Sequence, residues 1–206
     1  MVAITQSLWI KLLDWGYNRA LSGSKGMEKA SQLALHYADP SLSVNQQINA
    51  LIRHQQLLAG SSGFITGIGG LMSLPIAIPL NLASVVFIQL RMIAAIAHLG
   101  GFDIEDKRVK SMAYACMAGN AAKDIFQEIG IRTGTKLTQK LIYGISERSF
   151  ISVNEKIGFA LISRTGSKGL INLSKAVPIA GGIIAGSLDL ATTALIGKIA
   201  KKTFIG

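Results

Sequence analysis

The sequence of 206 residues is poor in cysteine, aromatic residues and charge, and each shortage excludes something. One cysteine, Cys116, rules out an intrachain disulfide framework and any CxxC metal motif, and its place between methionines in a helical pattern indicates an inert core thiol. Charged residues make up 16% of the chain and hydrophobic residues 50%, a composition too apolar for disorder. The low aromatic content, 6% beside 22 glycines, favours helices that pack closely through small side chains.

Motifs that carry catalysis or hold a cofactor are also missing. The sequence contains no GxxxxGK[ST] loop, no HExxH and no GxSxG elbow, and its three histidines, His36, His54 and His98, lack metal-ligand spacing. We therefore expect no catalytic residue, no metal and no cofactor. An aromatic-rich sheet motif and a helix-turn-helix signature are absent too, so nucleic acid is not an expected partner.

Positive charge is unevenly distributed along the chain. Residues 129–202 contain eleven Lys or Arg against three Asp or Glu, whereas residues 1–128 contain ten against eight. A basic segment of this kind attracts anionic lipid headgroups. The N-terminus lacks the early positive charge and continuous apolar run of a secretory signal, since its first basic residue is Lys11. We expect a cytoplasmic protein that associates peripherally with a membrane.

A long stretch from Gly60 to Gly101 carries a single formal charge, Arg91. Such a segment must be buried in protein or in lipid. Its pattern predicts a glycine-rich limb over 64–74, an elbow at the following prolines and an apolar helix over 80–99 that ends at paired glycines. Twenty helical residues span about 30 Å, enough to cross a hydrocarbon core.

A second apolar run begins at Pro178, and its only charge before Lys198 is Asp189. Gly182 and Gly186 give it a small-residue face that lets another helix lie close. We predict an all-α fold in which helices 80–99 and 178–197 form the centre of a single domain. The amphipathic helices expected around them cover 27–37, 43–58, 104–118, 121–129, 136–145, 149–162 and a short 170–176.

Residues 4–20 predict a further amphipathic helix with Trp9 and Trp15 on its apolar side. Two tryptophans on a short N-terminal helix suit a membrane interface, and they suit packing on the domain core equally well. We divide the chain into this helix, 1–22, and a helical domain, 23–206. On that division, deleting the helix would reduce membrane binding without unfolding the rest.

Polar residues of the two central helices are the candidate lipid-pocket residues. Ser84, Arg91 and His98 are seven apart and share one stripe, near Asn81. They either hydrogen-bond inside a core or face a ligand headgroup. Because a lone buried charge needs a partner, we predict that Arg91 pairs with Asp189 across the central helices.

Three ordered blocks resemble the EcsC family of bacterial proteins. They are GFITGIGGLMSLPIAIPLNLASVVFIQLRMIAAIAHLGGFD, then GNAAKD from Gly119, then AVPIAGGIIAGSLDLATTALIGKIAKKTF, and the resemblance covers about residues 48–204. The family has no established enzyme activity. The resemblance therefore implies a bacterial, all-helical, membrane-related protein and brings no catalytic residues.

The sequence as a whole predicts a non-enzymatic lipid- or membrane-binding protein whose basic half meets anionic phospholipid and whose apolar centre holds acyl chains. One alternative is an integral helical hairpin that serves as accessory subunit to a membrane protein partner. Another is a lipid-acting enzyme that uses Arg91 and Asp189. Spanning length alone does not separate a buried core from a transmembrane hairpin, but a basic segment between the two spans conflicts with the positive-inside rule.

Overall fold

The computed structural model describes residues 5–23, 26–60, 78–131, 138–166 and 178–206, and within them the fold is built from helices, without a strand. The predicted all-α class is confirmed. The limb 64–74 and the helix 170–176 lie outside the described residues. The helices are α1 (Gln6–Ser22), α2 (Ala30–Tyr37), α3 (Val44–Gly60), α4 (Leu80–Leu99), α5 (Lys107–Met117), the 3-10 turn η3 (Gly119–Ala121), α6 (Ala122–Glu128), α7 (Gln139–Tyr143), α8 (Glu147–Gly166) and α9 (Pro178–Phe204).

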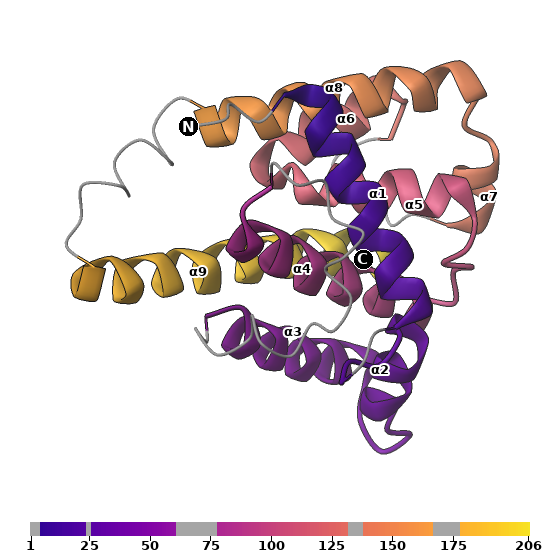
Figure 1. Cartoon of the computed structure of the whole chain (residues 1–206). Coiled ribbons are helices and arrows are strands. Elements are labelled where there is room, and N and C mark those ends of the chain that lie inside the picture. Colours follow the sequence, from indigo (N-terminus) through magenta and orange to yellow (C-terminus); the bar gives the residue numbers. More distant parts are fainter. Residues whose placement is uncertain (1–4, 24–25, 61–77, 132–137, 167–177) are drawn as a thin grey trace.

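Helix α4 runs through the middle of the molecule with the bounds that its flanking residues predict. It begins directly after Pro79 and ends before Gly100, and Gly101 then adopts a positive φ of 80° to turn the chain away. Helices α5, α6 and α8 lie on one side of it and α2 and α3 on the other, while α1 crosses in front and α9 runs alongside (Figure 1). Every residue from Val86 to Ala97 is buried, so the expected central position is confirmed.

Helix α9 is parallel to α4 and antiparallel to α3. Gln89 of α4 donates to Thr193 Oγ1 of α9 over 3.0 Å, and further along Gly100 lies against the end of α9. On the other side, a Cβ atom added at Gly197 would stand 2.9 Å from Cγ1 and Cγ2 of Ile52 in α3. Helix α9 therefore approaches its neighbours closely at Thr193 and Gly197. The predicted face at Gly182 and Gly186 lies outside the residues whose surroundings the structure describes.

Helix α1 belongs to the core. Trp9 is 3% exposed, and Leu12, Leu13 and Tyr17 are fully buried against α4 and its neighbours. The Tyr17 hydroxyl donates to the Ile104 carbonyl over 2.9 Å, and burial raises the pKa of this phenol. Of the two placements that the sequence left open for Trp9, the structure shows core packing. The boundary at residue 22 marks the end of a helix and no break in the core.

A hydrogen bond and a salt bridge join α1 to α5. The Tyr114 hydroxyl donates to Asp14 Oδ1 over 2.8 Å, and Lys110 Nζ lies 2.7 Å from the same oxygen. Burial, and after it the bond to Asp14, raises the pKa of Tyr114. These side chains fix α1 across the bundle, and its removal would expose the sides of α4 and α8 against which it packs.

Side-chain caps begin two of the helices that the sequence predicts. Ser43 Oγ accepts from the Gln46 amide at 3.3 Å, while Gln46 Oε1 accepts from the Ser43 amide at 2.9 Å, a reciprocal capping box. Asp106 Oδ1 accepts from the Arg108 amide, so α5 begins at residue 107 and not at the expected 104. Asp103 instead accepts from the Glu105 amide in the preceding turn.

Within the described residues, α4 is the one helix long and apolar enough to cross a bilayer. In its most apolar window of 18 residues, 78% of the residues are buried inside the protein. Core helices of water-soluble proteins satisfy the same criteria of length and composition.

Candidate functional site

Arg91 is buried, with 4% of its surface exposed, at the place where α4 meets α3 and the segment before α2. Its Nη2 donates to Gln55 Oε1 over 3.0 Å, and its Nη1 donates to the Glu28 carbonyl oxygen over 3.3 Å. The guanidinium carbon also lies 5.8 Å from the ring centre of Phe87. One side chain on α4 thereby holds two neighbouring elements in place.

The charge of Arg91 is retained despite this burial. Loss of solvation lowers its pKa to about 10, and electrostatic interactions with Glu28 and Tyr37 oppose the shift. No carboxylate of the described residues lies within ion-pair distance of the guanidinium, because the Glu28 carboxylate pairs with His36 at 3.2 Å. Arg91 is a cation that donates hydrogen bonds to neutral acceptors, an arrangement that suits a structural role in joining helices.

Two donors beside the Arg91–Gln55 hydrogen bond have no acceptor among the described residues. They are Nε of Arg91 and Nε2 of Gln55, both buried. Close by, Tyr37 of α2 and His54 of α3 share a hydrogen bond.

The predicted Arg91–Asp189 ion pair does not form. Asp189 lies on α9 in one stripe with Thr193, Ile196 and Ala200, all buried toward α4. Because α4 and α9 are parallel and Gln89 meets Thr193, Asp189 lies beside the first turns of α4, roughly 9 Å along the axis from Arg91. Burial raises the pKa of the half-buried Asp189 carboxyl.

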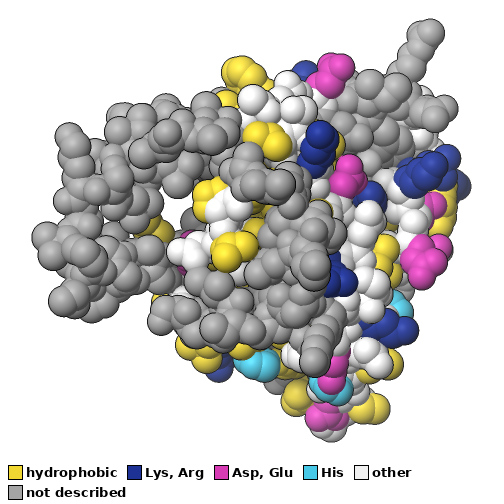
Figure 2. All heavy atoms as spheres, in the orientation of Figure 1, with side chains coloured by type: hydrophobic (Ala, Val, Ile, Leu, Met, Phe, Trp, Pro, Cys, Tyr) yellow, Lys and Arg dark blue, Asp and Glu magenta, His cyan; other side chains and the backbone are white. Residues whose placement is uncertain are grey.

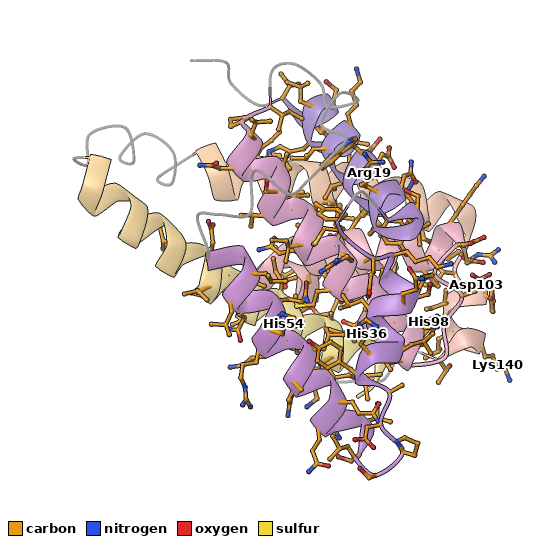
Figure 3. The ribbon with its side chains drawn as sticks, turned by 60° about the horizontal axis from the view of Figure 1, so that its bottom comes forward. Arg19, His36, His54, His98, Asp103 and Lys140 are labelled. Atoms are coloured by element: carbon orange, nitrogen blue, oxygen red, sulfur yellow. The ribbon has the colours of Figure 1, made fainter. Side chains whose placement is uncertain are left out.

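The remaining candidates are separated along α4. Asn81 is exposed in its first turn, and Ser84 is buried, donating to the Leu80 carbonyl of its own helix over 2.9 Å. His98 is exposed near the other end (Figure 3). The stripe 84–91–98 thus exists as a geometric feature, but its members face different surroundings and build no common pocket.

His98 lines an open cavity of about 460 Å³ between α1, the start of α2 and the turn after α4. Lys29, Asp103 and Glu105 contribute its charged side chains, and Phe102 is among its apolar ones. Asp103 lies near His98 in Figure 3. One lysine against two carboxylates leaves no excess positive charge, so this cavity does not suit an anionic headgroup.

Cys116 is fully buried, donates toward Thr203 Oγ1 at 3.7 Å and has a pKa raised to about 12 by burial. It is an inert core thiol, as its sequence context predicts. Across the described ranges no group of three or more His, Cys, Asp or Glu is arranged to hold a metal ion.

The surface of the α3–α9 pair differs from the rest of the molecule in its charge. Helices α3 and α9 together carry Arg53, Lys198, Lys201 and Lys202, and their only acidic residue is the inward-facing Asp189. Elsewhere, basic and acidic side chains are interspersed, as along the right edge of Figure 2. Sequence reasoning assigned the positive charge to the C-terminal half but missed that α3 contributes to the same surface; the absence of any Asp or Glu in α3 was the available signal.

Comparisons with protein-family models, with curated proteins and with solved structures find no match to this chain. The resemblance to the EcsC family therefore stays a prediction.

Proposed function

We propose that this is a non-enzymatic, membrane-associated protein that binds lipid and favours anionic lipid. The observation that carries the proposal is a set of exposed leucines where three helices converge. Leu57 in the last turn of α3 is 65% exposed, Leu80 at the start of α4 is 46% exposed and Leu188 of α9 is 50% exposed. Figure 1 shows α3 ending, and α4 and α9 beginning, toward the same end of the molecule.

Exposed apolar side chains toward one end of a molecule are typical of interaction sites, whereas those scattered over the whole surface are ordinary. The convergence is fixed by packing: Gly60 at the end of α3 lies directly against Leu190 of α9, two residues from Leu188. The net charge of +10 adds long-range attraction to an anionic surface. Apolar side chains that enter the headgroup region would then strengthen a contact that charge initiates.

A peripheral contact accounts for α4 better than a membrane span does. Most of α4 is covered by protein, and its one charge, Arg91, is hydrogen-bonded inside that protein. Crossing a bilayer would require α4 to leave these partners. No feature of the described residues favours the integral hairpin or the lipid-acting enzyme over this proposal.

Flotation with vesicles tests the proposal. Wild-type protein should float with vesicles of phosphatidylglycerol and phosphatidylcholine, less with phosphatidylcholine alone, and less again as salt rises. The double variant Leu57→Gln, Leu188→Gln should float less than the wild type. A matched control is Leu35→Gln, Phe159→Gln, since these residues are 64% and 70% exposed on other helices. If the wild-type protein floats with neither kind of vesicle, the proposal is wrong.

A further inference from the structure

The solvent side of the α3–α9 pair is a basic surface to which the described residues of these two helices contribute no exposed acidic side chain. In the antiparallel pair, α4 covers one side: Gln55 of α3 reaches Arg91, and Thr193 of α9 reaches Gln89. The opposite side is exposed. On α9 the exposed residues Leu188, Ala191, Lys198 and Lys202 follow one helical stripe, and on α3 the exposed residues Gln46, Ala50, Arg53 and Leu57 follow another.

The two stripes are neighbours. At the seam between the helices, Lys201 Nζ donates to Asn49 Oδ1 over 2.9 Å in an exposed hydrogen bond. Gly197 packs against Ile52, which places Arg53 of α3 at the level of Lys198 of α9. Three exposed cations, Arg53, Lys198 and Lys202, therefore lie on one side of the pair, with Lys201 at its seam.

Helices α3 and α9 contain little acidic sequence. Ten of the eleven Asp and Glu residues of the sequence lie outside α3 and α9, and the eleventh, the half-buried Asp189, lies one turn before Thr193, which accepts a hydrogen bond from Gln89 of α4. Neither helix supplies a neutralising partner for the exposed cations, and among the described residues Arg53, Lys198 and Lys202 form no ion pair. The exposed Leu57 and Leu188 lie on the same two stripes, toward the end where α9 begins.

We infer that the solvent side of the α3–α9 pair is the surface that docks on an anionic bilayer. The inference rests on the proposed function and adds which face of the molecule meets the lipid. Charge complementarity identifies the occupant: a bilayer is flat and negatively charged over the full length of two antiparallel helices, and each nearby Lys or Arg strengthens binding about fivefold. The leucines would enter the headgroup region while the lysines and the arginine stay at the surface.

Charge neutralisation at two places tests the face. The face variant is Arg53→Gln, Lys198→Gln, Lys202→Gln, which spares the hydrogen-bonded Lys201. The control variant is Lys11→Gln, Lys107→Gln, Lys123→Gln, three exposed lysines on α1, α5 and α6 with the same total loss of charge. The face variant should bind vesicles of phosphatidylglycerol and phosphatidylcholine roughly tenfold to a hundredfold more weakly than wild type. The control should lose far less, because charges beyond about 8 Å are screened at physiological salt.

The possible results test the proposed function and the docking face separately. If wild type does not bind, the proposed function is wrong and the face with it. If wild type binds and both variants weaken equally, or neither does, the function stands and this face is wrong. Circular dichroism and thermal unfolding establish that both variants are folded.

A second measurement avoids charge changes altogether. An environment-sensitive fluorophore on Leu57→Cys should shift to shorter wavelength when anionic vesicles are added, and one on Phe159→Cys of α8, on the opposite side of α4 (Figure 1), should not. Labelling is selective because the native Cys116 is buried. A shift at Phe159→Cys alone would assign docking to the other side of the molecule and overturn the inference.

Discussion

Arg91 and Gln55 join α4 to α3 through one buried hydrogen bond, in which the guanidinium Nη2 donates to the amide oxygen over 3.0 Å. Neither residue has an oppositely charged partner in this contact. The bond places a permanent cation in the core and satisfies it with a neutral acceptor. The two residues are energetically unequal. Loss of the Gln55 amide removes one acceptor from a buried charge, whereas loss of the Arg91 charge leaves only neutral groups unpaired.

We predict that Gln55→Leu lowers the free energy of unfolding by about 2–4 kcal/mol, because it removes an acceptor from a buried cation. Arg91→Met should cost less, about 1–3 kcal/mol, since it leaves a neutral amide unpaired. The double variant Gln55→Leu, Arg91→Met should be more stable than the sum of the two single effects implies. Urea unfolding of all four proteins measures this, and strictly additive effects would show that the residues do not interact.

The position of α4 could be predicted from the sequence, and the partner of Arg91 could not. An apolar run with one charge, bracketed by Pro79 and Gly100, defines a buried helix locally. Gln55 gives no comparable signal, because a glutamine in an amphipathic helix is ordinary and its use depends on how α3 rotates against α4. The expected Asp189 partner failed for the same reason: the relative shift of α4 and α9 is a long-range packing outcome.

Removal of the N-terminal helix should unfold the protein, contrary to the expectation from the sequence. Trp9 is 3% exposed, so Trp9→Ala should lower the free energy of unfolding by about 3–5 kcal/mol through lost burial and a cavity. Trp15 is only partly buried, with its ring centre 6.3 Å from that of Phe87. Trp15→Ala should therefore lower the free energy of unfolding clearly less than Trp9→Ala does. Thermal unfolding of both variants checks the order, and equal effects would contradict the burial difference.

Gly197→Ala tests the close contact between α9 and α3. A methyl group there would lie 2.9 Å from two Ile52 carbons, so we expect overpacking to cost about 1–3 kcal/mol despite the better helix propensity of alanine. Combining it with Ile52→Ala makes room for the methyl group. The double variant should therefore be less destabilised than the two single effects added together, as measured by urea unfolding. If Gly197→Ala instead stabilises the protein, the helices can separate at no cost.

Asp189→Asn should stabilise the protein at neutral pH. The carboxyl is half-buried on the inward stripe of α9, and loss of solvation raises its pKa from the ordinary 3.8. The charged groups of the helices packed against it are Arg53 and His54 of α3 and Arg91 and His98 of α4, and desolvation is the one cause of the shift. Since no group of the described residues offsets the desolvation of the anion, ionised Asp189 opposes folding.

The sign of the pH dependence follows from the raised pKa. Above the folded-state pKa, Asp189 is ionised in both states and the folded state carries the desolvation penalty. As pH falls through the folded-state pKa toward 3.8, the folded state takes up a proton first and the penalty disappears. The advantage of Asp189→Asn over wild type should accordingly be largest near pH 7 and vanish below 3.8. Glu155→Gln, an exposed carboxylate on α8, serves as the control and should give no such advantage. Urea unfolding across this pH range decides the matter: a variant less stable than wild type at pH 7 would mean that the carboxylate has a favourable partner in the folded protein.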